Sequence, residues 1–569
     1  MDKATYLKLK SVVNGEAKAD LLLKNCRVIN VFTGETISTN VGIKDGYFVY
    51  LSDEGSAKKE IDIEGKYLVP GLIDAHMHFE STVVTPRNFL SAAVKCGTTT
   101  FIADPHEAAN VSGAKGIQYI LDQTEDILAN VFVMLPSCVP STLLDDNGGI
   151  FSAEDMKPFL SNPRVLGLAE VMDVESVTSA KDSMFEKFEL FNHSRIIDGH
   201  CPVLSGPSLT NYRIAGVDTD HESITFESAL EKVRMGMQVL VREGSAAHNV
   251  EAIVKGILRS NIDTTNFCFC TDDRHIEDIR LTGHIDNNVR IAISLGLDPV
   301  KAIQMATINT ARRYGLKRLG AIAPGYQADF LIVDDLKKFA VSGIFVKGEN
   351  VAQFRRRIKT LKCPDDLLRT VNLDHISADR FKLPVGKESV HVIRIVPKQI
   401  TTEDVEQHFT PAANFKPYGK YQKIASIERH KRTGLIGVAI TEGYGLTNGA
   451  FAMTVSHDSH NVLVIGDSDD DMALAVNELI RLQGGIVLVE QGKIYEELAL
   501  PIMGLMSDAP HDEVKVKMDR LKKKAHEMGV SQDIDPFITL SFLSLPVIPR
   551  LRIIPRGLCL VEEQTPVLL

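Results

Sequence analysis

The chain has 569 residues, of which 44% are hydrophobic and 24% charged, and its formal net charge is −11. This length predicts about two to four domains, and the composition excludes a mainly disordered chain. The acidic balance argues against a surface that binds nucleic acid, so we expect no nucleic-acid partner.

The N-terminal residues and the cysteines predict a cellular compartment. Residues 1–20 lack the apolar segment of a signal peptide, and no run of about 18 apolar residues could span a membrane. The eight cysteines are scattered, and the closest pair, Cys268 and Cys270, lies inside an apolar run. Few cysteines in a long chain are typical of reduced, buried thiols. We therefore expect a cytoplasmic protein with no membrane partner.

The pattern of the chain changes near residue 71. Residues 1–70 contain short strand patterns separated by Gly and Asn, which predict a small β unit. From residue 71 onward a strand pattern followed by a helix pattern repeats until about residue 315, and this repeat predicts a (β/α)8 TIM-type barrel. A doubly wound open sheet is the alternative. The predicted barrel strands are 71–78, 98–105, 130–137, 164–171, 194–201, 214–221, 236–243 and 266–273.

The segments around the barrel predict two further units. Residues 316–365 return to short strand patterns that could pair with residues 1–70 in one small β domain built from both sides of the barrel. Residues 370–569 combine three strands with two amphipathic helices and predict a C-terminal α/β domain. The expected division is therefore a small β domain in two parts, a metal-binding barrel over 71–315, and a C-terminal domain.

Histidines and carboxylates stand at the ends of most predicted barrel strands. In this fold the loops after the strands form one mouth, which carries the active site. His76 and His78 point to the same face of their strand, about 6.5 to 7 Å apart along the backbone, so both can bind one ion. Two such histidines alone fit a polar strand edge equally well. Together the strand ends predict a metal site, whose expected ligands are His76, His78, Glu170, His200, His221 and Asp272.

Glu170 decides how many ions this site holds. It ends the apolar stretch RVLGLAE, where an ionised carboxylate is costly unless it is paired or coordinated. It could bridge two ions, with the first strand's histidines and Asp272 on one ion and His200 and His221 on the other. The alternative is that Glu170 pairs with a nearby Arg or Lys.

Several motifs resemble those of one family. GLIDAHMHFEST, DPHEAANV, GLAEVMD, DGHCP, TDHES, VREGSAAHN and TVSHDSHN are similar to segments of the bacterial-type adenine deaminases of the amidohydrolase superfamily, and the resemblance covers nearly the whole chain. It implies hydrolysis of adenine to hypoxanthine and ammonia in purine salvage, with adenine and water as the substrates. It also implies two divalent metal ions per subunit, with manganese or iron favoured and zinc possible. We further expect a homo-oligomer.

The end of the fourth predicted strand departs from the wider superfamily. Several members with two metal ions, such as the dihydroorotases, carry a bridging carboxylated lysine there, whereas this sequence has Glu170. The resemblance to adenine deaminases implies that the glutamate is the bridge. This difference weighs against a dihydroorotase-like or urease-like activity.

The resemblance also implies catalytic roles. Two divalent ions that share one water lower its pKa and supply the hydroxide that attacks C6 of adenine. Asp272 then takes the proton of that water and delivers it to the departing ammonia. Glu243 and His106 are the candidates to protonate N1, although either could instead orient a metal ligand. Arg242 and Ser245 either hold the purine edge or are ordinary loop residues.

Three polar residues lie outside the predicted barrel. His457, Asp458 and His460 in MTVSHDSHN either belong to a lid over the mouth of their own or a neighbouring subunit, or form a hydrogen-bonded turn. The sequence leaves both interpretations open.

Two other functions compete with adenine deamination. One is another deaminase or amide hydrolase of the same class, acting on guanine, cytosine or an N-acetyl sugar. The other is a barrel that has lost catalysis and serves as a scaffold. The presence of all six expected ligands disfavours the scaffold.

Overall fold

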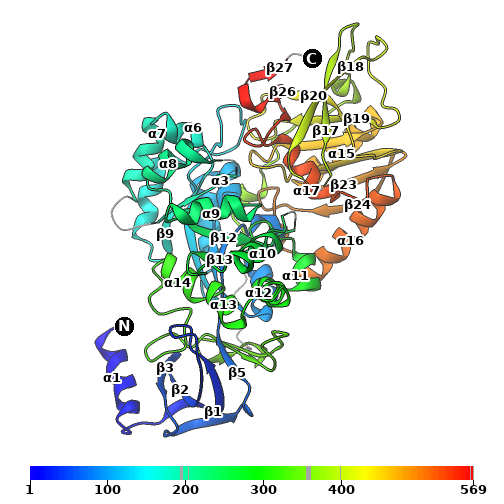
Figure 1. Ribbon diagram of the computed structural model, residues 1–569. Coiled ribbons are helices and arrows are strands. Elements are labelled where there is room, and N and C mark those ends of the chain that lie inside the picture. Colours follow the sequence, from blue (N-terminus) through cyan, green and yellow to red (C-terminus); the bar gives the residue numbers. More distant parts are fainter. Residues whose placement is uncertain are drawn as a thin grey trace.

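The computed structural model describes residues 1–191, 196–202, 204–245, 247–353, 361–397, 399–563 and 565–567. In Figure 1 the N-terminal strands lie at one end, parallel strands with surrounding helices lie in the middle, and a strand-rich C-terminal region lies at the other end. Within these ranges no helix has the length and apolar character needed to cross a bilayer.

One eight-stranded sheet combines strands from both sides of the central region. Its order is β16-β15-β14-β5-β1-β2-β3, with β4 beside β1. β14 (Phe330–Val333) pairs antiparallel with β5 (Tyr67–Pro70), so the chain segments before and after the central region meet in this sheet. The other strands are β1 (Ala19–Ile29), β2 (Thr36–Lys44), β3 (Tyr47–Leu51), β4 (Ala57–Asp62), β15 (Val341–Val346) and β16 (Glu349–Asn350).

A helix that the sequence patterns did not predict precedes this sheet. α1 (Lys3–Val13) buries Leu9 and Val12, which are three residues apart and therefore lie on one face. Asp2 caps the helix by accepting a hydrogen bond from the Thr5 N–H at 2.8 Å. The first seventy residues are therefore not entirely β.

Parallel strands form the central region, and each overlaps its predicted range. The sixth is much shorter than predicted, because among residues 214–221 only Thr219 and Asp220 are in a strand and Ile214 ends a helix. Five pair in the order β10-β9-β8-β7-β6 and three in the order β11-β12-β13. Hydrogen bonds also join the two groups: the Asp272 N–H donates to His76 O at 2.9 Å, and the Asp218 N–H donates to Ile197 O at 3.3 Å. The result is a curled parallel sheet. Its strands are β6 (Leu72–Met77), β7 (Thr98–Ala103), β8 (Asn130–Leu135), β9 (Val165–Val171), β10 (Ile196–Gly199), β11 (Thr219–Asp220), β12 (Gln238–Arg242) and β13 (Phe267–Cys270).

Residues 194 and 195 of the fifth predicted strand lie outside the described residues. Helices cover the outer side of the parallel strands (Figure 1). α10 illustrates how, because Val250, Ile253 and Ile257 form an apolar face that packs with Phe267 and Phe269 of β13. The central helices are α2 (Pro86–Ala93), α3 (His106–Ser112), α4 (Ala114–Gln123), α5 (Ala153–Met156), α6 (Val174–Thr178), α7 (Asp182–Glu189), α8 (Gly206–Ile214), α9 (Phe226–Arg234), α10 (Val250–Ser260), α11 (Ile276–Thr282), α12 (Ile285–Ser294), α13 (Pro299–Met305) and α14 (Ile308–Arg313).

The C-terminal region holds a second eight-stranded sheet, with more strands than the three predicted. Its order is β18-β17-β20-β19-β22-β21-β23-β24, and its pairs are antiparallel except for β17 with β20. β18, with the sequence TEDVEQ, has a single apolar residue, so it carries no strand pattern. The strands are β17 (Val390–Ile395), β18 (Thr402–Gln407), β19 (Tyr421–Ile427), β20 (Ile436–Glu442), β21 (Gly449–Met453), β22 (Val462–Gly466), β23 (Gly485–Glu490) and β24 (Lys493–Ala499).

Both helices predicted for this region are present. α15 (Asp469–Leu482) packs on the sheet through Met472 and Val476, and Ser468 caps it. α16 (His511–Glu527) buries Met518 and Leu521. A third helix, α17 (Pro536–Ser541), and a small sheet of β25 (Leu551–Ile554), β26 (Gly557–Leu560) and β27 (Thr565–Val567) end the region.

The C-terminal region packs on the carboxyl ends of the central strands. The Ser507 N–H donates to Val83 O at 2.9 Å, and the Thr85 N–H donates to Ser507 O at 3.1 Å. Arg280 in α11 forms an ion pair of 3.0 Å with Asp512 in α16. One continuous hydrophobic core spans both regions, so the strand ends face the C-terminal region rather than open solvent.

Candidate metal centre

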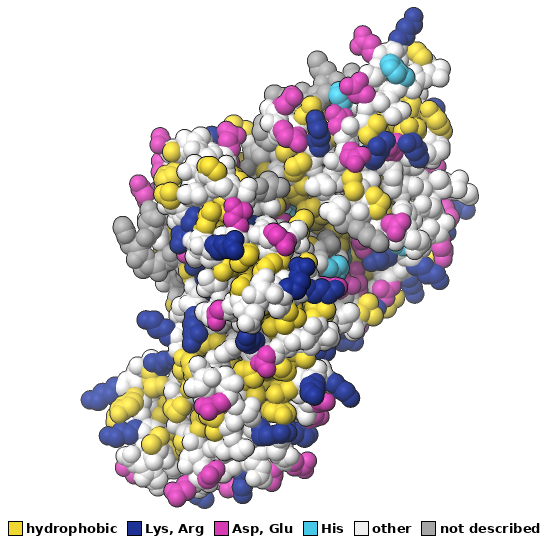
Figure 2. All heavy atoms as spheres, in the orientation of Figure 1, with side chains coloured by type: hydrophobic (Ala, Val, Ile, Leu, Met, Phe, Trp, Pro, Cys, Tyr) yellow, Lys and Arg dark blue, Asp and Glu magenta, His cyan; other side chains and the backbone are white. Residues whose placement is uncertain are grey.

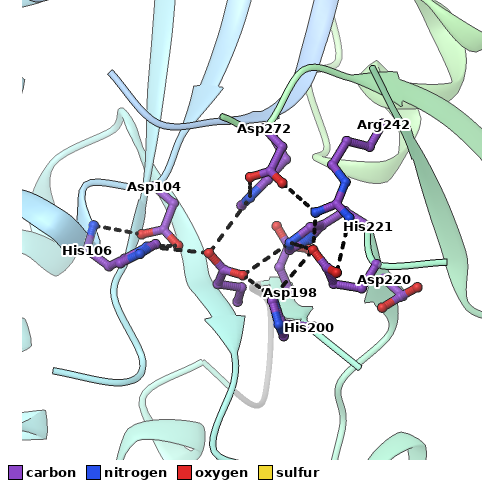
Figure 3. A network of polar contacts seen from close by, with 12 residues as sticks. Asp104, His106, Asp198, His200, Asp220, His221, Arg242 and Asp272 are labelled. Carbon is purple, nitrogen blue, oxygen red and sulfur yellow. Dashed lines mark hydrogen bonds and ion pairs between the residues drawn. The ribbon is translucent and has the colours of Figure 1, made fainter. Parts of the chain in front are cut away.

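The six expected ligands come together at the carboxyl ends of the parallel strands. His76 lies on β6 and Glu170 on β9. His78, His200 and His221 directly follow β6, β10 and β11, and Asp272 follows β13 after one residue. Figure 3 shows His200, His221 and Asp272 pointing toward one another from different strands. Glu170 is 3% exposed and His221 is 2% exposed, so these ionisable groups are buried. Strand convergence thus places residues from five strands in one cluster.

Glu170 divides its two carboxylate oxygens between two pairs of histidines. Its Oε1 lies 3.5 Å from Nε2 of His78 and 3.9 Å from Nε2 of His76. Its Oε2 lies 2.8 Å from Nδ1 of His200 and 3.2 Å from Nε2 of His221. Burial alone would raise the pKa of Glu170, but the charge of His221 and the hydrogen bond from His200 outweigh it and hold that pKa well below its usual range. Glu170 is therefore an anionic carboxylate between two imidazole pairs.

Asp272 occupies the other side of the first histidine pair. Its Oδ1 lies 3.0 Å from Nε2 of His78 and 3.5 Å from Nε2 of His76, and its Oδ2 accepts a hydrogen bond of 2.6 Å from Nη1 of Arg242. Arg242 also binds Glu222, with Nη2 3.1 Å from Oε2. Burial would raise the pKa of Asp272, but the Arg242 guanidinium outweighs it and holds that pKa well below its usual range.

The donor atoms fit divalent transition metals. Nδ1 of His78 donates to the carbonyl oxygen of Asp104 at 2.9 Å, which leaves the Nε2 lone pair of His78 directed into the cluster. Nε2 of His76 is buried without a hydrogen-bond partner among the described residues. Candidate donor atoms within 4.8 Å of one another form five sets among the described residues. Two lie at the centre of the cluster, one of His76, His78 and Asp272 and the other of His76, Glu170 and His221. The remaining sets are His78, Asp104, His106 and Glu170; His200, His221 and Glu222; and Glu107, Asp273 and His457. Imidazole and carboxylate ligands without thiolate suit Mn, Fe and Zn.

His106 lies beside this cluster. Its Nδ1 is 3.3 Å from Oδ2 of Asp104 (Figure 3) and 3.4 Å from Oε1 of Glu170. Its Nε2 is 3.8 Å from Oδ1 of Asp458. Burial lowers the pKa of His106, but the carboxylates of Asp104 and Asp458 outweigh it and raise that pKa well above its usual range. The two carboxylates therefore favour the protonated form of His106 beside the cluster.

Two other predicted site residues, Glu243 and Ser245, form hydrogen bonds away from the cluster. Oε1 of Glu243 lies 2.8 Å from Nδ1 of His248, and its Oε2 accepts from the Val250 N–H at 3.3 Å. The Ser245 hydroxyl donates to Asp278 and accepts from the His275 N–H. Neither Glu243 nor Ser245 belongs to the described residues that line the cavity over the cluster. This placement does not favour Glu243 as the N1 acid or Ser245 as a purine contact. Arg242 does line the cavity, but two carboxylates hold its guanidinium.

The cavity above the cluster includes residues of the C-terminal region of the same chain. Its empty volume is about 400 Å³, which includes space open to solvent. His457 and Asp458 line it together with His78, Glu170 and Asp272, and Nδ1 of His457 lies 2.6 Å from Oε1 of Glu107. His460 instead stabilises a turn, because its Nδ1 accepts from the Ser456 N–H at 3.2 Å. The further apolar lining residues are Met172, Ile400, Phe542, Leu545 and Ile548.

Sequence reasoning missed three acidic residues of this cavity, namely Glu107, Glu222 and Asp273. Glu222 directly follows the ligand candidate His221, and Glu107 directly follows His106 in DPHE. Their adjacency to strand-end histidines was the only signal available. Asp273 directly follows the ligand candidate Asp272, and it accepts a hydrogen bond from the Ser81 hydroxyl.

The curled parallel sheet and the buried imidazoles and carboxylates at its carboxyl ends define a hydrolase of the amidohydrolase class, and residues 67–351 match the model of the amidohydrolase family. Residues 398–565 match the adenine deaminase C-terminal domain. The chain is 50% identical to an adenine deaminase of Desulfitobacterium hafniense (strain Y51), over 99% of both chains. It is 41% identical to an adenine deaminase of Clostridium acetobutylicum, over 95% of this chain and 96% of the relative. This chain belongs to the adenine deaminase family.

Among solved structures, a crystal structure of an adenine deaminase aligns with 58% of this chain and 99% of its own, at 19% sequence identity and a TM-score of 0.46.

Proposed function

We propose that this chain hydrolyses adenine to hypoxanthine and ammonia. The observation that carries the proposal is the position of Glu170, whose two oxygens face two separate histidine pairs in a buried cavity. A carboxylate in that position suits a bridge between two cations. In a member of the adenine deaminase family, such a site supports hydrolytic removal of the purine amino group.

The proposal includes the architecture that holds the site. The eight parallel strands close into a (β/α)8 barrel, supported by the hydrogen bonds of Asp272 to His76 and of Asp218 to Ile197 between the two strand groups. Residues 71–315 form this barrel, residues 1–70 and 316–365 form the small β domain, and residues 370–569 form the C-terminal α/β domain.

We assign two divalent ions to the six clustered residues. His76, His78 and Asp272 would hold one ion, His200 and His221 the other, and Glu170 both. Manganese or iron is favoured and zinc is compatible with the same donors. When bound, the two ions supply a hydroxide at neutral pH by lowering the pKa of a water molecule.

The side chains of the cavity have separate tasks in this proposal. Asp272, anionic and held by Arg242, takes the proton of the attacking water and passes it to the leaving amine. His106 lines the cavity and carries a proton, so it is better placed than Glu243 to protonate N1 of adenine. Arg242 orients Asp272 and Glu222 rather than contacting the purine edge. These are the tasks that substitution of each residue would test.

The physiological setting that we propose is purine salvage in the cytoplasm by a homo-oligomer, with adenine and water as the substrates. All eight cysteines are free, which suits a reducing compartment. On the face shown in Figure 2, basic and acidic side chains are interspersed, which fits a small-molecule substrate better than a nucleic acid.

Ammonia release tests the proposed activity. Protein loaded with Mn²⁺ is offered adenine, guanine, cytosine and an N-acetyl sugar in parallel. Turnover of adenine alone supports the proposal. Turnover of one of the other substrates but not of adenine would assign a different reaction to the same site. Protein that binds no metal and turns over none of them would instead be a scaffold.

A further inference from the structure

A short segment of the C-terminal region, Ser456–Asn461, closes one side of the cavity over the cluster. All of its residues are buried, and His457 and Asp458 line the cavity. The His457 ring stacks on Phe542 with centroids 4.4 Å apart and an angle of 11° between the ring planes. The substrate cavity therefore has two walls, one from the central strands and one from the C-terminal region.

Backbone hydrogen bonds fix this segment in place. The His457 N–H donates to Ser541 O at 3.1 Å, and the Ser544 hydroxyl donates to His457 O at 3.2 Å. The His460 N–H donates to Ser456 O at 2.6 Å. The backbone on both sides of Asp458 is thus held by hydrogen bonds, which limits the positions that its carboxylate can take.

The position of Asp458 relative to the cluster is set by His106. Oδ1 of Asp458 lies 3.8 Å from one ring nitrogen of His106, and the other ring nitrogen lies 3.4 Å from Oε1 of Glu170. One imidazole ring therefore separates Asp458 from the carboxylate at the centre of the cluster.

Asp458 retains an oxygen that can accept a hydrogen bond. Its Oδ2 is buried and has no hydrogen-bond partner among the described residues. Two other acidic lining residues face a cationic side chain, since Glu107 lies beside His457 and Glu222 pairs with Arg242. A buried acceptor without a donor costs free energy, so this oxygen favours a ligand that brings an N–H group.

We propose that Asp458 accepts a hydrogen bond from the N–H of the purine five-membered ring, and so selects the free base over purines substituted at N9. This inference rests on the proposed function, which places the reacting C6 at the cluster and the five-membered ring at the opposite end of the base. Phe542, Leu545 and Ile548 line the cavity near Asp458 and offer apolar contacts to the flat faces of the base. The C-terminal region is then a specificity-determining part of the site.

The test compares adenine with 9-methyladenine, which has no N–H in its five-membered ring. The full chain loaded with Mn²⁺ is assayed as wild type, Asp458→Asn and Asp458→Ala, with Asp470→Asn on the exposed face of α15 as the matched control. We expect wild type to prefer adenine in kcat/KM. We expect both Asp458 variants to raise the KM for adenine roughly 10- to 100-fold while 9-methyladenine is little affected, because only adenine loses a charge-assisted hydrogen bond.

The outcomes separate the two proposals. Variants that lower kcat/KM equally for both substrates would give Asp458 a structural role only, and a wild type without preference would overturn the inference outright. Equilibrium binding of both bases is measured alongside. A wild type that binds adenine more tightly than 9-methyladenine, loses this difference in Asp458→Ala, and deaminates neither would uphold the inference and reject the proposed activity.

Discussion

His457 in the C-terminal region and Glu107 at the start of α3 form a buried ion pair, with 2.6 Å between Nδ1 and Oε1. Burial lowers the pKa of His457, but the Glu107 carboxylate outweighs it and raises that pKa to about 9. The pair joins the two regions beside the metal cluster, so it contributes both to stability and to the shape of the cavity.

Replacing Glu107 leaves His457 buried without its anion. Because breaking a buried pair from one side costs about 3 to 5 kcal/mol, we expect Glu107→Gln to lower the free energy of unfolding by that order. Denaturant unfolding measures it. Glu154→Gln, which removes the exposed partner of Lys157, is the control and should cost less than about 1 kcal/mol. Equal small losses in both variants would show that the buried pair adds no stability.

Glu170→Gln tests the carboxylate between the two histidine pairs. Loss of its negative charge removes the group that holds two cations together, so we expect loss of at least one ion per chain and a fall in activity of more than about 100-fold. Metal analysis of the purified variant gives the first quantity, and ammonia release gives the second. Glu227→Gln, on the exposed first turn of α9, should retain both. A Glu170→Gln protein that keeps two ions would reject the bridging role.

Asp272→Asn separates metal binding from proton transfer. The amide keeps an oxygen near His76 and His78 but cannot take a proton from water. We therefore expect metal content close to wild type with kcat lower by about 10²- to 10⁴-fold. Metal content and kcat are measured on the same preparation. Losses of metal and of kcat in equal proportion would identify Asp272 mainly as a ligand.

His275 predicts a dependence of stability on pH. Burial lowers its pKa, but Glu277 outweighs it, with a smaller contribution from Asp535, and raises that pKa to about 9 from the ordinary value of 6.5. Because the folded value is the higher one, the stabilisation is complete below pH 6.5 and is lost as the pH rises through about 9. We expect His275→Gln to lower the free energy of unfolding by about 1 to 3 kcal/mol at pH 6 and by much less at pH 9.5.

Urea unfolding of the His275 variant at both pH values measures this effect. His408→Gln, at an exposed position, serves as the control for the substitution itself. A loss of stability that is the same at pH 6 and pH 9.5 would mean that packing, rather than the charge of His275, accounts for the change.

The sequence predicted the parallel strands and the six clustered residues for one physical reason. Repeated strand and helix patterns set the order of the strands, and parallel strands that curl together bring their carboxyl ends to one place. His76 and Asp272 are nearly two hundred residues apart in the sequence, but each lies near the carboxyl end of a predicted strand. Grouping them therefore required no information about long-range contacts.

The sequence patterns could not predict contacts that depend on the direction of a side chain or on packing between segments far apart in the chain. Glu243 follows a strand as Glu222 does, but a local bridge to His248 takes it away from the cavity. Docking of the C-terminal region brings Asp458 to the cluster and His457 to Glu107, and no spacing in the chain encodes these contacts. The polar strand β18 was missed because a single apolar residue forms no pattern, and α1 was missed because only Leu9 and Val12 of its apolar residues share a buried face.

The most direct test of this account is the conversion of adenine by the full chain at a known metal content. Protein with two Mn²⁺ ions per chain is mixed with adenine, and hypoxanthine and ammonia are quantified beside the Glu170→Gln variant. The account predicts equal amounts of the two products from wild type and almost none from the variant. Wild-type protein that holds two ions and forms no hypoxanthine would contradict it.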